Sequence, residues 1–202
     1  MGRKSVSKDR KAITPKVNKW LGVLLHDIQG EDLKSLTMDD LVRISGKSKS
    51  TFYTYFESKE EVLQAACQTR VQTIFYELQK VDVLSKDVSK IYSDFIEIFA
   101  NGTTGIRLDF LQSIRKYYPL VWKQIEFLTN TFVGLLSDLY KRGIEMGIYN
   151  NISVELLTAM DKMFVVELVT NPELFSDDKY SVSDLVRDYL RLRLNGLLKL
   201  EA

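Results

Sequence analysis

The stretch TMDDLVRISGKSKSTFYTYFESK, Thr37 to Lys59, decides the fold of the N-terminal part of the chain. Thr37 and Asp40 have the spacing of a capping box, so a short helix is expected to start after Thr37. Gly46 is expected to end that helix, because glycine adopts the left-handed conformation that a tight turn requires. Ser48 can then cap a second short helix. Two short helices joined by a glycine turn predict a helix-turn-helix.

The second short helix has two different faces. Phe52 and Phe56 are four residues apart, so they share one helical face and are expected to pack inward. The opposite face carries hydroxyl and basic groups with no acid, and such groups can bond base edges and phosphates. Its residues are Lys47, Ser48, Lys49, Ser50, Thr51, Tyr53 and Thr54. This face predicts a surface that reads duplex DNA, and the alternative is a polar surface helix without a partner.

Helical spacing continues on both sides of this stretch. A stripe of apolar residues predicts an amphipathic helix that starts near Pro15 and stops at Gly30. Ser58 and Glu61 form a second capping box, which opens a long helix. Further helices are expected at 84–100, 104–117, 120–146, 153–170 and 182–199. The fold class is therefore all-α.

Composition narrows the classes of protein. The 202 residues are 45% hydrophobic and 27% charged, as in an ordinary globular protein, and no apolar run approaches the roughly 18 residues of a membrane span. Cys67 is the only cysteine, which rules out an internal disulfide and fits a cytoplasmic location. One histidine and one cysteine leave no zinc cluster, and the sequence has no glycine-rich phosphate loop and no nucleophile elbow. We therefore expect no membrane partner, metal, cofactor or enzymatic activity.

Positive charge is concentrated at the N-terminus, although the net charge of the chain is only +1. Residues 1–59 hold 12 basic and 7 acidic side chains. The basic groups of the first 19 residues are Arg3, Lys4, Lys8, Arg10, Lys11, Lys16 and Lys19, against the single acid Asp9. A positive end on a nearly neutral chain indicates contact with a polyanion, although a solvated arm has the same composition.

The helix-turn-helix stretch resembles the tetracycline-repressor (TetR) family of transcriptional regulators. The resemblance lies in a fixed order of residues with a T-aromatic-Y core and a closing F-x-S-K-E: Thr37, Leu41, Ile44, Gly46, Ser48, Thr51, Tyr53, Phe56, Ser58, Lys59 and Glu60. Lys47 and Ser50 depart from the family pattern, so the sequence of the operator does not follow from it.

The resemblance implies a ligand-responsive repressor that binds palindromic operator DNA, a double-stranded partner, as a homodimer. Residues 1–59 would form the basic arm and helix-turn-helix DNA-binding domain, and residues 60–202 a helical ligand-binding and dimerisation domain, with about nine helices in all. Thr37 and Lys59 would contact phosphates, while Lys49, Ser50, Thr51, Tyr53, Thr54 and Tyr55 would enter the groove. The alternative is a helical adaptor that keeps the fold and binds protein without operator recognition.

The last predicted helix is apolar on two faces, and both must be buried. One face can cover its own domain, and the other can meet a partner subunit together with the preceding helix. The expected dimer interface is Leu157, Met160, Phe164, Leu168, Leu185, Tyr189, Leu192 and Gly196. A helix wholly buried within a monomer is the alternative.

Most aromatic residues follow the helix-turn-helix. By the family resemblance, some would line a pocket between the long fourth helix and the helices after it, suited to a mostly apolar small-molecule effector. The expected ligand-binding residues are Phe75, Phe95, Phe99, Arg107, Gln112, Trp122, Phe127 and Asn130. The alternative is that these rings form only the core. An effector would shift the separation of two DNA-reading heads through the helix opened by Ser58.

Overall fold

The computed structural model describes residues 10–171 and 181–199. Within this part of the chain there are nine α-helices and no strand, which confirms the all-α class. The helices are α1 (Pro15–Asp27), α2 (Met38–Ser45), α3 (Lys49–Tyr55), α4 (Lys59–Leu78), α5 (Val88–Gly102), α6 (Leu108–Tyr117), α7 (Pro119–Glu145), α8 (Val154–Thr170) and α9 (Val182–Leu197). None of the helices so described is long and apolar enough to cross a membrane.

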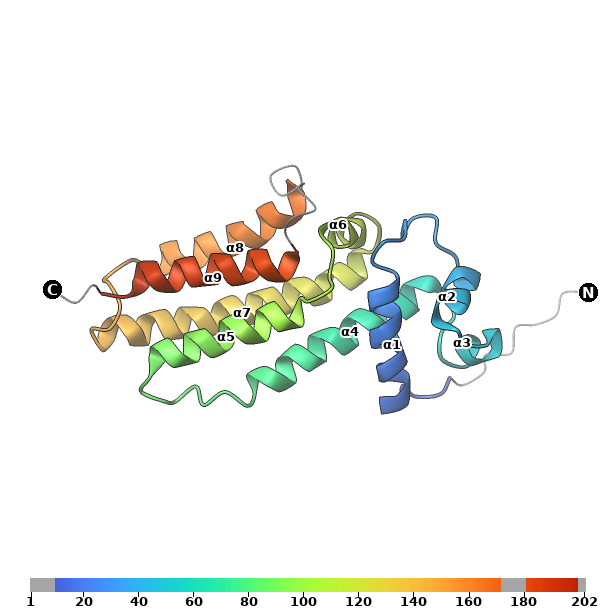
Figure 1. The fold of residues 1–202 in the computed structure, drawn as a ribbon, viewed down its shortest axis with the longest axis horizontal. Helices are drawn as coiled ribbons and strands as arrows, with labels where there is room; N and C mark the ends of the chain where they lie inside the picture. The colour runs from blue at the N-terminus through green and yellow to red at the C-terminus, as the bar shows by residue number, and fades with distance from the viewer. Residues whose placement is uncertain (1–9, 172–180, 200–202) are drawn as a thin grey trace, which may run out of the picture.

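The helices form two regions joined by α4 (Figure 1). Helices α1 to α3 lie together at one end and are called the head. Helices α5 and α7 to α9 run side by side at the other end and, with α6 across the junction, are called the body. Helix α4 packs on α1 in the head and on α5 and α7 in the body. It is therefore the continuous element that connects the two regions.

Local signals set the ends of the head helices. Thr37 and Asp40 form the complete capping box of α2, and Gly46 ends that helix with a φ of 61°. Ser48 caps α3 by accepting a hydrogen bond from the Thr51 N–H at 3.2 Å. The prediction for α1 is wrong at its end, because the helix stops at Asp27 and a short turn follows. The capping and turn signals of the sequence are otherwise confirmed here.

Two body helices begin later than their apolar pattern suggests. Helix α5 begins at Val88, because the carboxylate of Asp87 caps it by accepting a hydrogen bond from the Lys90 N–H at 2.8 Å. Helix α6 begins at Leu108, because Gly105 has a φ of 74° and breaks the helical path before it. The apolar residues ahead of both starts lie in loops.

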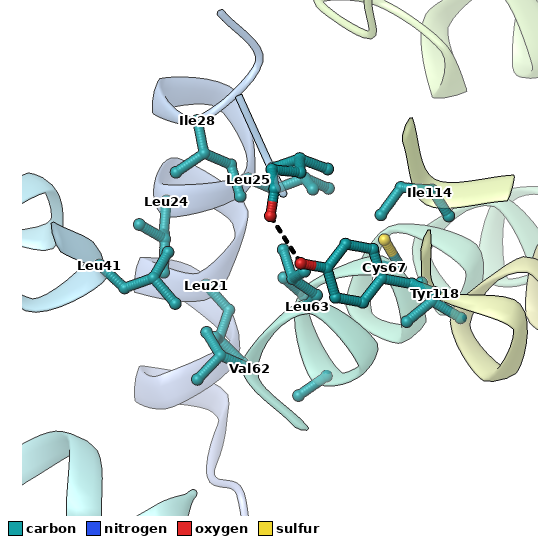
Figure 2. Close-up of a cluster of buried hydrophobic side chains, with 14 of the residues drawn as sticks. Leu21, Leu24, Leu25, Ile28, Leu41, Val62, Leu63, Cys67, Ile114 and Tyr118 are labelled. Atoms are coloured by element: carbon teal, nitrogen blue, oxygen red, sulfur yellow. Dashed lines mark hydrogen bonds between the residues drawn. The ribbon is translucent and has the colours of Figure 1, made fainter. Parts of the chain in front are cut away.

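The core has two clusters of buried side chains. The first, called the head core, joins α1 to α3 with the start of α4, and it also includes Ile106, Phe110, Ile114, Tyr118 and Val121 from α6, α7 and the loop before them. Figure 2 shows Tyr118 and Ile114 beside Leu63 and Cys67, facing Leu25 and Ile28 of α1. The second cluster fills the body. The head therefore shares its core with elements that follow it far along the chain.

Buried hydrogen bonds fix the joint between head and body. The hydroxyl of Tyr118 donates to the Leu33 carbonyl oxygen at 2.6 Å, the bond drawn in Figure 2. The Gln29 side chain is only 5% exposed; it donates to the Leu25 carbonyl oxygen and accepts from the Arg107 N–H at 2.9 Å. Buried polar groups are costly unless paired, so these bonds specify one orientation of the head on α6 and α7.

Candidate nucleic-acid interface and internal cavity

The seven-residue helix α3 is held by aromatic packing on its inner side. Phe52 is fully buried, and its ring centroid lies 5.1 Å from that of Trp20 on α1. Phe56, the residue that ends the helix, is also buried, and its ring contacts Trp20 at 6.1 Å. This wedge of rings places the helix on α1 and fixes which of its faces points outward.

The outer side of α3 carries small hydroxyl groups, one exposed ring and two lysines. Ser50 and Tyr53 are exposed, and Tyr53 retains 46% of its accessible surface. Thr51 and Thr54 are half-buried, and the Thr54 hydroxyl donates to the Ser50 carbonyl oxygen at 2.8 Å. The other exposed members of this surface are Lys47, Ser48 and Lys49. We call these seven residues, Lys47 to Thr54 without Phe52, the outer face of α3.

Three residues expected at this interface either lie away from the outer face of α3 or form hydrogen bonds within the chain. The Lys59 ammonium donates to the carbonyl oxygens of Leu33 and Lys34, at 2.9 and 3.3 Å, so its assignment to a phosphate does not fit this conformation. Tyr55 is half-buried against the head core and contacts the Phe56 ring, which turns it away from the outer face. Thr37 is exposed, but its hydroxyl donates to Asp40 in the capping box.

The described end of the basic arm lies against α3 and the start of α4. The Lys11 N–H donates to the Thr54 carbonyl oxygen at 3.2 Å, at the end of α3. The Arg10 guanidinium pairs with both Glu57 and Glu61. The remaining basic residues of the arm, Arg3, Lys4 and Lys8, lie outside the described residues. The arm therefore reaches the head beside its outer face.

An internal cavity of about 160 Å³ lies under α4 and reaches from the head into the body. Its walls come from α1 and from α4 through α9. Leu25 and Cys67 form its head end, and Phe132 of α7 and Leu190 of α9 lie among the body residues that line it. Burial raises the pKa of the Cys67 thiol to about 12, so this thiol is uncharged at neutral pH. Cavities of similar size with apolar walls hold a small apolar molecule.

Asp161 is a buried polar side chain in the cavity wall, and it is bonded to partners within the chain. Asp161 is 3% exposed, and its carboxylate accepts from the hydroxyls of Tyr140 at 2.8 Å and Tyr189 at 2.7 Å. It also pairs with Arg193 at 3.3 Å. The Trp122 N–H donates to Glu126 at 2.8 Å. The carboxylate of Asp161 is therefore paired within its own network. The Arg70 guanidinium also lines the cavity; it is half-buried and donates to the Thr104 carbonyl oxygen at 3.5 Å, so the mostly apolar wall holds one cation.

The expected ligand-binding residues are mostly displaced from this cavity. Phe99 and Trp122 line it as predicted. Phe95 is buried in the body core against Phe132, and Phe75 contacts the ring of Phe127, which is 64% exposed. Arg107 pairs with Asp109, Asn130 is exposed, and Gln112 is half-buried in α6, and these three also lie outside the cavity wall. Two of the eight expected residues therefore line this cavity and six do not, and the assignment of these residues to a ligand stays a prediction.

Several residues expected at a dimer interface face inward. Leu157 is buried in the body core, and Phe164, Leu168 and Tyr189 line the cavity. The rings of Phe164 and Tyr189 are stacked at 3.9 Å, which closes one side of it. Leu157 and Leu168 are buried within their own chain, while Phe164 and Tyr189 are half-buried, and the assignment of these four residues to a dimer interface stays a prediction. Leu185 is half-buried, while Met160, Leu192 and Gly196 are exposed.

Exposed apolar side chains on α8 and α9 overlap the predicted interface only at Met160 and Leu192. They are called the exposed stripe, and its members are Leu156, Met160, Met163, Val166 and Leu192, with exposed fractions between 43 and 71%. Val165, Val169 and Val186 of the cavity wall were missed as well. The sequence contains a signal for them, since α8 is apolar around most of its circumference and such a helix buries more than one face.

Comparison with known proteins agrees with this arrangement. Residues 28–66 match the model of bacterial regulatory proteins of the tetR family. The chain is similar to the HTH-type transcriptional regulator SAR0097 of Staphylococcus aureus (strain MRSA252), with 34% identity over 159 residues that cover 75% of this chain and 73% of the relative.

Two solved structures share the fold at low sequence identity. A putative transcriptional regulator from Saccharomonospora viridis in complex with choline has a TM-score of 0.66 and 11% identity, over 93% of this chain and 100% of that one. The transcriptional regulator FadR from Bacillus subtilis in complex with stearoyl-CoA has a TM-score of 0.57 and 17% identity, over 88% and 98%. The helix-turn-helix head, the match of residues 28–66 and the 34% identical relative together show that the chain belongs to the tetR family of bacterial regulatory proteins, which are DNA-binding transcriptional regulators.

Proposed function

We propose that this protein is a ligand-responsive repressor that binds a palindromic operator as a homodimer. The observation that carries the proposal is the outer face of α3, which presents hydroxyls, an exposed tyrosine ring and two lysines. The helix itself contains no acidic residue. Such groups can donate to phosphates and base edges, and the tyrosine ring can contact thymine methyl groups. In the proposed division, residues 1–59 read DNA and residues 60–202 bind the effector and the partner subunit.

The cavity supports a mostly apolar effector. Its apolar walls gain from contact with apolar groups, while the one buried carboxylate in the wall, Asp161, is already paired. Two proteins of the same fold bind choline and stearoyl-CoA, which shows that the fold accommodates chemically different ligands. Here the carboxylate of Asp161 is paired and Arg70 lines the same wall, so the charges of the cavity disfavour a cation.

The cavity also supports a route to the head. Leu25 of α1 and Cys67 of α4 belong to the cavity wall and to the head core at once. A ligand that binds one orientation of the head better shifts the population toward it, and coupling of about 1–3 kcal/mol is usual. We expect the effector to weaken operator binding, and equal affinity with and without every ligand tested contradicts this part.

The exposed stripe on α8 and α9 supports a homodimer. Four of its five large apolar side chains, Leu156, Met160, Met163 and Val166, follow one another at helical spacing on α8, and exposed apolar patches mark protein interfaces. A two-fold dimer would place two α3 helices about 34–36 Å apart, one turn of DNA. Sedimentation that gives the mass of one chain at all concentrations contradicts this.

The test of the proposed function is selection of bound sites from a random duplex pool, followed by substitution of the outer face. We expect a palindrome, and we expect Y53A/T54A to weaken binding to it by roughly ten- to a hundredfold, since base contacts contribute about 1–3 kcal/mol each. The matched control is T73A/Y76A on α4, an exposed threonine and tyrosine whose threonine hydroxyl also bonds a carbonyl four residues earlier. Unchanged DNA binding by Y53A/T54A, with the dimer intact, favours a protein-binding adaptor.

A further inference from the structure

A carboxylate from α2 contacts the outer face of α3. Lys49 is the first residue of α3, and its ammonium lies 2.7 Å from Asp39 in the first turn of α2. Both side chains are well exposed, at 60% for Lys49 and 69% for Asp39. The hydrogen bond from Lys49 to Asp39 raises the pKa of the lysine, so Lys49 stays charged. The pair therefore links the two helices of the motif at the surface proposed to meet DNA.

Neighbouring carboxylates have structural partners of another kind. Asp40 completes the cap of α2, and Glu57 and Glu61 hold Arg10 of the arm. Asp39 instead holds a residue of the outer face. An exposed ion pair contributes little to folding, typically about 0–1 kcal/mol. A carboxylate close to phosphates also opposes binding. As a carboxylate in the first turn of α2, Asp39 also favours the helix dipole, typically by about 0.3–1 kcal/mol, so its contribution to stability is small. General DNA affinity does not account for an acid at this position.

We propose that Asp39 is a specificity-determining residue, which positions Lys49 for a base; this rests on the proposed DNA-reading function. A lysine ammonium has three N–H donors on a flexible stem, so an unrestrained Lys49 can turn to a phosphate as readily as to a base. Asp39 takes one donor and repels phosphate oxygens. The two remaining donors match the O6 and N7 acceptors of one guanine in the major groove.

The pair thereby exchanges a contact without sequence information for one that reads a base. Phosphate contacts position a protein on DNA, whereas contacts to base edges specify the sequence. Asp39 lowers the affinity for all DNA and raises the preference for the selected half-site sequence over other sequences. The measurable quantity is therefore the ratio of specific to non-specific affinity, and not the affinity for the operator alone.

The experiment uses the full chain and the site that it selects from a random duplex pool. Affinities for that site and for a scrambled duplex are measured over a range of salt for wild type, D39N, K49A and D39N/K49A. We expect D39N to lower the specificity ratio about tenfold and to lose the guanine preference at one position of each half-site. We expect its salt slope to steepen by about 0.9, as Lys49 gains a phosphate. K49A should lose the preference for the same guanine, and D39N/K49A should show no further loss of specificity beyond that of K49A.

The matched control is D94N, which removes an exposed carboxylate of α5 that pairs with Lys90 at 2.9 Å. D94N changes the net charge by the same amount as D39N and should leave the specificity ratio unchanged. The conservative variant D39E should keep much of the specificity ratio that D39N loses. A D39N variant that keeps the ratio and the guanine preference overturns the inference while the proposed function stands. Equal strengthening of both duplexes also overturns it, because Asp39 then acts by repulsion alone. A wild-type chain that selects no site overturns the proposed function as well.

Discussion

The head and the body use their polar side chains in opposite ways. In the head, the hydroxyls of α3 and the ammonium groups of Lys47 and Lys49 stay at the surface, over a wedge of aromatic rings. In the body, Asp161 gathers two tyrosine hydroxyls and a guanidinium into a closed cluster beside an apolar cavity. Polar groups are thus exposed to solvent in one region and buried against one another in the other.

This contrast explains how one chain can suit two unlike partners. A charged polymer such as DNA is attracted by exposed donors that remain solvated until contact. An apolar molecule gains most from a wall whose polar atoms are already bonded and need no solvent. The two regions can therefore be disturbed separately, and the predictions below are ordered from the largest expected effect.

The largest effect is expected when the aromatic wedge of the head is removed. F52A deletes a fully buried ring, so we expect a loss of about 3–5 kcal/mol in the free energy of unfolding, with loss of operator binding. Urea unfolding and DNA titration measure the two effects. The control is F95A, which deletes a buried ring of the body and should keep operator binding wherever the protein is folded. Operator affinity unchanged in F52A would show that the head core does not set the geometry of α3.

A somewhat smaller effect is expected when the buried cluster of the body loses its charge. D161N leaves the Arg193 guanidinium, 12% exposed, without its partner carboxylate, which should cost about 3 kcal/mol in the free energy of unfolding. The control is D138N, an exposed carboxylate on α7 near Lys141, for which we expect a change below about 0.5 kcal/mol. Urea midpoints that shift equally in the two variants would contradict the assignment of Asp161 as the centre of the cluster.

The smallest effect concerns the joint between the regions. Y118F removes one buried hydroxyl that donates to the Leu33 carbonyl oxygen, so we expect a loss of about 1 kcal/mol in the free energy of unfolding. Y117F, at the more exposed neighbouring tyrosine, is the control. If the joint carries the signal of the cavity, Y118F also reduces the effect of an effector on operator affinity. An unchanged unfolding free energy would mean that this hydrogen bond does not stabilise the joint.

The head was predictable from the sequence because its determinants are local. The capping box at Thr37, the turn at Gly46 and the inward pair Phe52 and Phe56 all depend on residues within four positions of one another. Lys59 is the exception. Its side chain bonds carbonyl groups of the loop before α2, more than twenty residues earlier, and no local pattern encodes that contact.

Only the apolar character of the cavity was predictable from the sequence. An excess of aromatic residues suggests apolar walls, but it does not say which helix faces meet across them. Phe127 belongs to the same helix as Trp122, yet one ring is exposed and the other lines the cavity. Similarly, Phe164 and Tyr189 were expected at a subunit interface, because the last helix has two apolar faces and one of them was assigned to a partner subunit. The two rings instead stack on each other. Only the tertiary packing decides which face turns inward.

The shared head core has a consequence for protein engineering. Leu25 and Ile28 of α1 share a core with Ile114, Tyr118 and Val121, which come from α6, the residue that follows it and the first turn of α7. A chimaera that joins residues 1–59 to a foreign sensor would leave Leu25 and Ile28 against unmatched neighbours. A transplant that carries α6 and the first turn of α7 along with the head and α4 should keep this core folded, so the exchangeable unit is discontinuous in sequence.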